Sequence, residues 1–111
     1  MDKRELDRRL QIVRALARQA GDVIMSYYKT SVEVELKAPG DPVTAADKAA
    51  NELIVNQLHK TFLGEAVLAE ESTDDLSRLG QDLVWMVDPL DGTKEFISRN
   101  GEFSVMIGLI E

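Results

Sequence analysis

The sequence contains no cysteine and only one histidine, His59. The absence of cysteine excludes a disulfide framework, a zinc–thiolate site and a thiol nucleophile, and it is compatible with a cytoplasmic protein. His59 has no second residue at a metal-binding spacing, so we interpret it as a surface or packing residue. The chemistry of this chain must therefore come from other residue types.

Long apolar runs are also missing. No stretch of about 18 apolar residues is present, and the first five residues lead into an amphipathic pattern without the apolar core of a signal peptide. Basic residues are outnumbered, with 13 Lys and Arg against 20 Asp and Glu and a net charge of −7. Such a chain repels polyphosphate unless metal ions intervene. We therefore expect a soluble protein that binds no nucleic-acid polymer and has no transmembrane segment, and whose anionic substrate is small and bridged by metal.

At 111 residues the chain is long enough for one domain, and it shows no linker or repeat. Its first segment, to about Tyr28, and a second segment that ends near Gly64 have the periodicity of amphipathic helices. The expected apolar stripes are Leu6, Leu10, Val13, Ala17, Ala20, Ile24 and Tyr27 in the first helix, and Ala46, Ala50, Leu53, Ile54, Leu58 and Phe62 in the second. We expect both stripes to pack in the core, although a coiled-coil seam remains an alternative for the first.

The remaining segments favour strands. Residues 31–36 alternate in polarity, which predicts a strand with one wet face, and a turn rich in Pro and Gly follows at residues 37–42. The apolar runs at residues 66–69, 83–87 and 103–110 are typical of strands in a sheet that is covered on both faces. Trp85 lies inside the second run and therefore predicts core packing more than a stacking platform for a base. The fold class is thus α+β, a layered fold with two helices packed on a β-sheet.

Acidic residues follow two of the predicted buried strands. Glu70 and Glu71 come directly after residues 66–69, and the segment Asp88-Pro89-Leu90-Asp91-Gly92-Thr93 comes directly after residues 83–87. Ligands bind such sheets at the carboxyl ends of the strands. These acids are therefore candidates for a binding site.

Magnesium suits this arrangement, because it takes about six oxygen ligands and keeps several waters. Glu70, Asp88 and Asp91 would supply carboxylates, and Leu90 would add its backbone carbonyl. Gly92 permits the close backbone approach that a phosphate requires. An Asp-rich turn is the structural alternative, since Asp, Pro and Gly are common turn residues. A calcium EF-hand fits worse, because only the Asp-Gly pair matches that loop.

A further acid begins the second predicted helix. Thr44 is placed as the N-cap and Asp47 as the third helical residue, as in a capping box. Capping alone would account for Asp47. Its position in the chain, ahead of the other two acidic clusters, adds a second interpretation.

With these three motifs in this order, the sequence resembles the inositol monophosphatase superfamily of magnesium-dependent, lithium-sensitive phosphatases. The motifs are DPVTAAD at residues 41–47, the acidic pair at residues 70–71 and WMVDPLDGT at residues 85–93. Residues 94–103 resemble the CysQ-type 3'(2'),5'-bisphosphate nucleotidases more than the inositol monophosphatases, which usually carry Thr-Asn-Phe after the DGT motif. Family members are much longer, and their second half supplies another metal-binding aspartate and much of the substrate pocket. Residues 1–111 are therefore interpreted as the amino-terminal metal-binding domain, without the carboxy-terminal half.

The resemblance implies a role for each matching residue. Glu70, Asp88 and the Leu90 carbonyl match the ligands of one magnesium, Asp88 is shared, and Asp91 matches a ligand of a second ion; Glu70 can also reach a third. Thr93 and Asp47 match the pair that positions and deprotonates the attacking water. The substrate-binding residues implied by the match are Glu70, Leu90, Asp91, Gly92 and Thr93.

The expected function is hydrolysis of the 3'-phosphate of 3'-phosphoadenosine 5'-phosphate in sulfate assimilation, with two or three Mg²⁺ ions activating water. An inositol or sugar monophosphatase is the alternative, and a non-catalytic metal-binding or assembly module is an alternative of another class. The resemblance implies a cytoplasmic location, and it leaves open peripheral contact with the inner membrane and a homodimer. Residues 1–111 alone are expected to be weakly active or inactive.

Overall fold

The computed structural model describes residues 1–28, 34–38, 41–69, 72, 77–91 and 104–110. The elements in chain order are α1 (Lys3–Tyr28), β1 (Val34–Ala38), β2 (Asp41–Thr44), α2 (Ala45–Thr61), β3 (Ala66–Ala69), the short 3-10 helix η1 (Ser77–Gly80), β4 (Val84–Asp91) and β5 (Ser104–Ile110). For β1, β2 and residues 90 and 91 the description covers the backbone only. No helix in the described part of the chain is long and apolar enough to cross a membrane.

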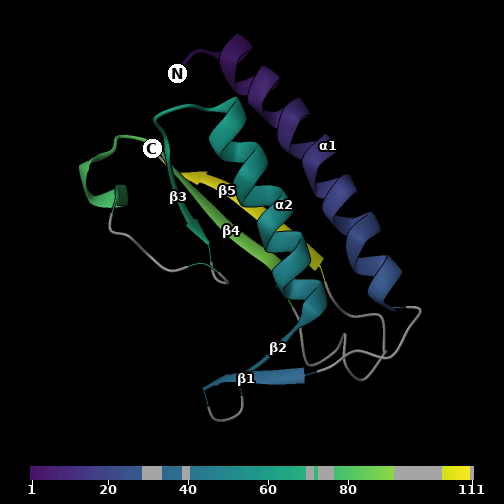
Figure 1. Ribbon diagram of the computed structural model, residues 1–111. Coiled ribbons are helices and arrows are strands. Elements are labelled where there is room, and N and C mark those ends of the chain that lie inside the picture. Colours follow the sequence, from purple (N-terminus) through teal and green to yellow (C-terminus); the bar gives the residue numbers. More distant parts are fainter. Residues whose placement is uncertain (29–33, 39–40, 70–71, 73–76, 92–103, 111) are drawn as a thin grey trace.

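The two helices form one layer and a three-stranded sheet of order β3-β4-β5 forms the other. Figure 1 shows α2 lying along the sheet with α1 beside it. Helix α2 contacts β3 and β4, whereas α1 contacts α2 and β5. Both helices therefore lie on the same face of the sheet, and the predicted layered α+β fold is confirmed.

Helix α1 begins where Asp2 caps it. The Asp2 Oδ1 atom accepts a hydrogen bond from the backbone N–H of Glu5 at 2.8 Å, which satisfies one of the free donors of the first turn. The helix then ends at Tyr28, as predicted. Its inward face was predicted only in part.

The buried side of α1 contains Leu16, Ala20 and Ile24, which are at most 5% exposed. Leu6 and Leu10 were predicted to belong to this side, but they are 52% and 51% exposed, so that prediction was wrong. The physical reason is that the amino-terminal turns direct Arg9 inward, where it finds a carboxylate partner from another element. The helix is rotated accordingly, and the two leucines face solvent.

Helix α2 follows the sequence prediction closely. It begins at Ala45, directly after Thr44, so Asp47 is the third helical residue. The predicted stripe is buried at Ala46, Ala50, Ile54, Leu58 and Phe62, while Leu53 packs against its edge. The chain leaves the helix through Gly64, whose φ of 81° is a left-handed conformation that glycine adopts most easily.

The hairpin of β1 and β2 was predicted only in its first half. The two strands pair antiparallel, with an irregularity between Leu36 and Ala38. Residues 37–42 were expected to form a turn, but β1 extends to Ala38 and β2 begins at Asp41. Pro42 argued against a strand, yet a proline is tolerated in an edge strand, and this pair has two edges.

The three-stranded sheet combines both pairings. Strand β3 runs parallel to β4, and β4 pairs antiparallel with β5. Strand β4 was predicted to end at Val87, but it continues to Asp91. Its register with β5 shifts between Asp88 and Asp91. Asp88 faces Met106 and Asp91 faces Ser104, so β4 carries one extra residue there, as in a β-bulge.

The helices cover only one face of the sheet. Trp85 and Val87 are 2% and 4% exposed beneath them, as predicted for core residues. On the alternate positions, Met86 is 38% exposed, and Met106 on β5 is 54% exposed. The expectation of a sheet covered on both faces is therefore not met within the described part of this chain.

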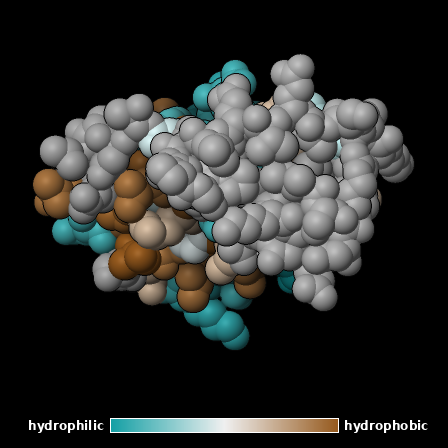
Figure 2. Space-filling view, turned by 90° about the horizontal axis from the view of Figure 1, so that it is seen from below, coloured by the Kyte–Doolittle hydropathy of each residue, from teal (hydrophilic) through white to brown (hydrophobic). Residues whose placement is uncertain are grey.

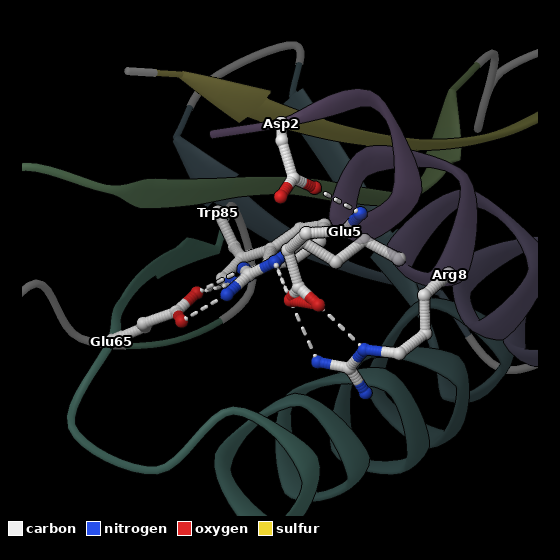
Figure 3. Close-up of polar contacts among 6 residues, drawn as sticks. Asp2, Glu5, Arg8, Glu65 and Trp85 are labelled. Carbon is white, nitrogen blue, oxygen red and sulfur yellow. Dashed lines mark hydrogen bonds and ion pairs between the residues drawn. The ribbon is translucent and has the colours of Figure 1, made fainter.

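The amino-terminal ends of β3 and β4 are tied to α1 by a partly buried ion pair. The Arg9 guanidinium donates to both carboxylate oxygens of Glu65 at 2.6 and 2.7 Å, and Trp85 Nε1 donates to Glu65 at 3.0 Å. Figure 3 shows Glu65 turned toward Trp85. The same guanidinium lies 4.6 Å from the ring centre of Phe62, which stacks on Trp85 at 4.9 Å. One charged group thus connects α1 with β4 and with the segment between α2 and β3.

Candidate active site

The parallel pairing of β3 and β4 builds the frame of the predicted site. The register places Ala69 opposite Val87, so both strands reach the same edge of the sheet at these residues. Glu70 follows Ala69 in the chain and Asp88 follows Val87. The sequence prediction that two strands carry acids to one common edge is therefore consistent with the observed topology.

Asp88 occupies the first position of the bulge in β4. It is half-buried, and Pro89 beside it is fully buried. Pro89 has no N–H to donate, but β3 pairs with β4 only as far as Val87, so no ladder bond to β3 is lost there. A bulge bends a strand and re-aims its side chains, which is a common feature beside active sites.

A broad hollow of about 1010 Å³ opens beside Asp88. Its walls are mostly apolar and come from the ends of β3, β4 and β5 together with the segment after β3. The lining residues are Leu68, Ala69, Ser72, Met86, Val87, Asp88, Val105, Met106, Ile107 and Gly108. Figure 2, which views the molecule from below, shows exposed hydrophobic residues on this side of the molecule.

Asp47, in the first turn of α2, lies at the same end of the molecule. Figure 1 shows α2 beginning near the carboxyl end of β4. The Asp47 side chain is only 1% exposed, although it lies in the first turn of a helix, where carboxylates are usually solvated. Capping explains a carboxylate at this position, but an exposed one would cap equally well. The burial distinguishes Asp47 from a solvated capping carboxylate, and its role in a site stays a prediction.

Two polar residues at this end were not predicted from the sequence. Asn51 lies one turn after Asp47 on α2 and is 7% exposed, and its Nδ2 atom donates to Ser72 Oγ at 2.8 Å. The spacing of four residues between Asp47 and Asn51 was the available signal, since such residues share one face of a helix. It was missed because a single asparagine between Ala50 and Glu52 has no motif of its own.

Several predicted site residues cannot be placed in this geometry. Glu70, Glu71, Gly92 and Thr93 lie outside the described residues. Leu90 and Asp91 are placed by their backbone in β4, and their side chains lie outside the description. Their predicted roles as ligands and substrate contacts stay predictions.

The donors present here fit magnesium by their chemistry. The described residues bring two carboxylates, from Asp47 and Asp88, to this end of the sheet, and the chain has no thiolate that would favour a softer metal. Within the described residues, no three His, Cys, Asp or Glu side chains form a group that could hold a metal ion. A complete ligand set therefore requires residues outside the description, such as Glu70.

Among the described residues, the carboxylates whose pKa values are lowered lie near the other end of β3. The pKa of Glu5 is lowered to about 2 by its hydrogen bonds from Arg8 and then Arg9. Figure 3 shows Glu5 turned toward Arg8. The pKa of Glu65 is lowered from its ordinary value of 4.5, first by the hydrogen bond from Arg9 and then by that from Trp85. Glu65 precedes β3 and Ala69 ends it, so this cluster supports the fold and does not enter the site.

The arrangement of motifs along this fold is matched by a family model. The inositol monophosphatase family matches residues 5–111. The chain belongs to the inositol monophosphatase family. The resemblance inferred from the three motifs is thereby confirmed, and the layered fold of helices on a sheet is that of the family's amino-terminal part.

Similar proteins include members with different names and functions. The 3'(2'),5'-bisphosphate nucleotidase CysQ of Escherichia coli K12 is 48% identical over 99 residues, which cover 86% of this chain and 40% of that protein. The Nus factor SuhB of the same organism is 39% identical over 102 residues, covering 90% of this chain and 38% of that protein. The solved structure of CysQ from Bacteroides thetaiotaomicron has a TM-score of 0.69 at 46% identity, covering 86% of this chain and 35% of that one.

Family membership alone does not determine the substrate. The chain spans about 40% of the length of the curated relatives that it matches. The family is one of phosphatases, but its members at comparable similarity carry different names. The family thus fixes the fold, and the activity and substrate of the whole protein are matters for a proposal.

Proposed function

We propose that the complete protein is a magnesium-dependent phosphomonoesterase that removes the 3'-phosphate from 3'-phosphoadenosine 5'-phosphate. The observation that supports this most is the pairing of Ala69 with Val87, because it brings the strands that precede Glu70 and Asp88 to one edge of the sheet. The choice of substrate rests on the 48% identity to a bisphosphate nucleotidase and on residues 94–103.

Each predicted site residue would have a distinct task in this reaction. Glu70, Asp88 and Asp91 hold two or three Mg²⁺ ions with their carboxylates, and Leu90 adds its carbonyl. Bound magnesium supplies charge neutralisation for the phosphoryl group and lowers the pKa of water. Thr93 accepts a hydrogen bond from the attacking water, and Asp47 orients the Thr93 hydroxyl and takes up the proton. As the oxygen of this water bonds to phosphorus, the bond from phosphorus to the 3'-oxygen breaks, and the 3'-oxygen leaves as a hydroxyl group with a proton from solvent water. Gly92 leaves room for the phosphate to approach the backbone.

A second candidate is hydrolysis of an inositol or sugar monophosphate. The family match favours it, because the proposed metal-binding residues would be the same for either substrate. A third candidate, of another class, is a metal-binding or assembly module without turnover. It is favoured by the exposed apolar residues of the sheet, of which Met106 and Ile110 are both 54% exposed.

Phosphate release by the complete protein separates these candidates. We expect Asp88→Asn to lower kcat/KM by a factor of about 10³, because it removes a carboxylate that holds the metal and so weakens the neutralisation of charge in the transition state. The matched control is Asp82→Asn, since Asp82 is an exposed aspartate that lies just before β4. The control should keep its activity within about twofold, as expected of a surface substitution.

The rates of phosphate release from the bisphosphorylated nucleotide and from inositol 1-phosphate distinguish the first two candidates. Faster release from the bisphosphorylated nucleotide than from inositol 1-phosphate supports the proposal, and equal rates would remove its substrate claim. Magnesium binding without any turnover would favour the non-catalytic module. We also expect the activity to be inhibited by lithium and residues 1–111 alone to release little phosphate.

A further inference from the structure

The buried amide of Asn51 is only half satisfied. Its Nδ2 atom donates to Ser72 Oγ at 2.8 Å, whereas its Oδ1 atom is buried and has no hydrogen-bond partner among the described residues. A leucine of similar size would pack at this place without leaving a polar atom unpaired, and replacing such a group by an apolar one often costs no stability. Packing therefore does not account for an amide at position 51.

Ser72, the hydrogen-bond partner of Asn51, follows the predicted acidic pair directly in the sequence. The Ser72 N–H also donates to the Ala69 carbonyl at 3.2 Å. In the sequence, Glu70 and Glu71 lie between these two residues. Ala69 pairs with Val87 at the end of β3, and Ser72 is tied to α2 through Asn51.

The helix that provides this tie also provides Asp47. Asn51 lies four residues after Asp47, so both side chains project from the same face of α2. Both are buried, at 7% and 1% exposure, and Ser72 lines the hollow that Asp88 also lines. Asn51 thus connects the helix that carries one predicted site residue to the segment that carries another.

We propose that Asn51 is a positioning residue of the metal site: it holds Ser72 against α2, and Ser72 follows the proposed ligand Glu70 by two residues in the sequence. The inference rests on the proposed function, because it assumes that Glu70 binds magnesium. Groups that orient a metal ligand without touching the metal commonly change metal affinity by about ten- to hundredfold when they are removed.

The test measures Mg²⁺ affinity of the complete protein by titration calorimetry, together with the unfolding temperature of the metal-free form. We expect Asn51→Leu and Ser72→Ala each to weaken Mg²⁺ binding by about tenfold or more, with no fall in the metal-free unfolding temperature. Ser72→Thr keeps an acceptor hydroxyl and should bind Mg²⁺ as the unmodified protein does. Asn56→Leu is the matched control, since Asn56 is an exposed asparagine on the same helix.

The double variant Asn51→Leu with Ser72→Ala adds a second criterion. If the two residues act through one hydrogen bond, the double variant should bind Mg²⁺ no more weakly than the weaker of the single variants. Unchanged Mg²⁺ affinity in both single variants would overturn the inference, and so would an affinity loss in Asn51→Leu alone that is accompanied by a lower unfolding temperature. Failure of the unmodified protein to bind Mg²⁺ would instead overturn the proposed function, and this inference with it.

Discussion

At the scale of single residues, the described chain separates carboxylates that support the fold from those at the candidate site. Glu65 is held by the Arg9 guanidinium and by Trp85 at the start of β3. Asp47 and Asp88 lie at the opposite end of the sheet, where α2 begins and β4 bulges. The role of Glu65 shows only in the structure, because its partner Arg9 lies 56 residues away in the sequence.

The ion pair of Glu65 provides a test of the supporting role. The Arg9 and Glu65 side chains are 10% and 18% exposed, so solvent screens their attraction only in part. We expect Glu65→Gln to lower the free energy of unfolding at pH 7 by about 2 kcal/mol, because a hydrogen-bonded charge is removed from a partly buried site. Chemical denaturation measures this value, and Glu52→Gln, on the exposed side of α2, should change it by less than about 0.5 kcal/mol.

The effect of Glu65→Gln on the free energy of unfolding should decrease as the pH falls. The folded-state pKa of Glu65 lies below its ordinary value of 4.5, so its contribution is complete above pH 4.5 and is lost as the pH falls through the lowered pKa. The difference in free energy of unfolding between Glu65→Gln and the unmodified protein should therefore become smaller as the pH is lowered. A gap that stays constant between pH 7 and pH 3 would show that the charge of Glu65 does not contribute.

At the scale of elements, the two glycines that lie in and after the helices should respond in opposite ways. Gly64 has a φ of 81° and Gly21 lies inside α1, and an added Cβ would meet nothing within 4 Å at either residue. We expect Gly64→Ala to destabilise the fold by about 1 kcal/mol, because alanine is strained in the left-handed region. Gly21→Ala should stabilise it by up to about 1 kcal/mol, since alanine favours a helix interior. Thermal unfolding of the two variants gives the sign directly, and equal signs would contradict the assigned backbone.

The elements themselves could largely be predicted from local pattern. Both helices and the strands β3, β4 and β5 follow from periodicity and apolar runs, because burial on one side imposes a repeat on the sequence. The inward face of α1 could not be predicted, because Arg9 is drawn inward by Glu65, which lies 56 residues away. Strand β2 was missed because Pro42 is read locally as a breaker, although its pairing with β1 has room for it.

Single acidic residues of the candidate site could be predicted from the sequence, but the hydrogen bond between its polar residues could not. Asp47 and Asp88 could be selected because their residue types and order match a family pattern, and the structure places them at one end of the sheet. Asn51 and Ser72 could not, because a hydrogen bond between residues 21 apart leaves no trace in either local sequence. Residues that position a ligand are in general harder to predict than the ligand itself.

At the scale of the whole molecule, the described residues form a two-layer structure in which the helices cover one face of the sheet. The helices cover one side of the sheet, and the other side carries exposed Met86 and Met106 beside the hollow at Asp88. The site thus lies where the covered core meets this open side. The chain spans about 40% of the length of the relatives it matches, so the proposed catalysis is that of the complete protein.

The proposed chemistry depends most on a divalent-cation centre between β3 and β4. The most direct measurement is anomalous diffraction from crystals of the complete protein soaked in Mn²⁺, which takes the same oxygen ligands as Mg²⁺ and scatters anomalously. We predict a peak within coordination distance of the Glu70 and Asp88 carboxylates, with Asp91 and the Leu90 carbonyl beside it. A peak bound elsewhere, with these four groups directed away from one another, would contradict the proposal.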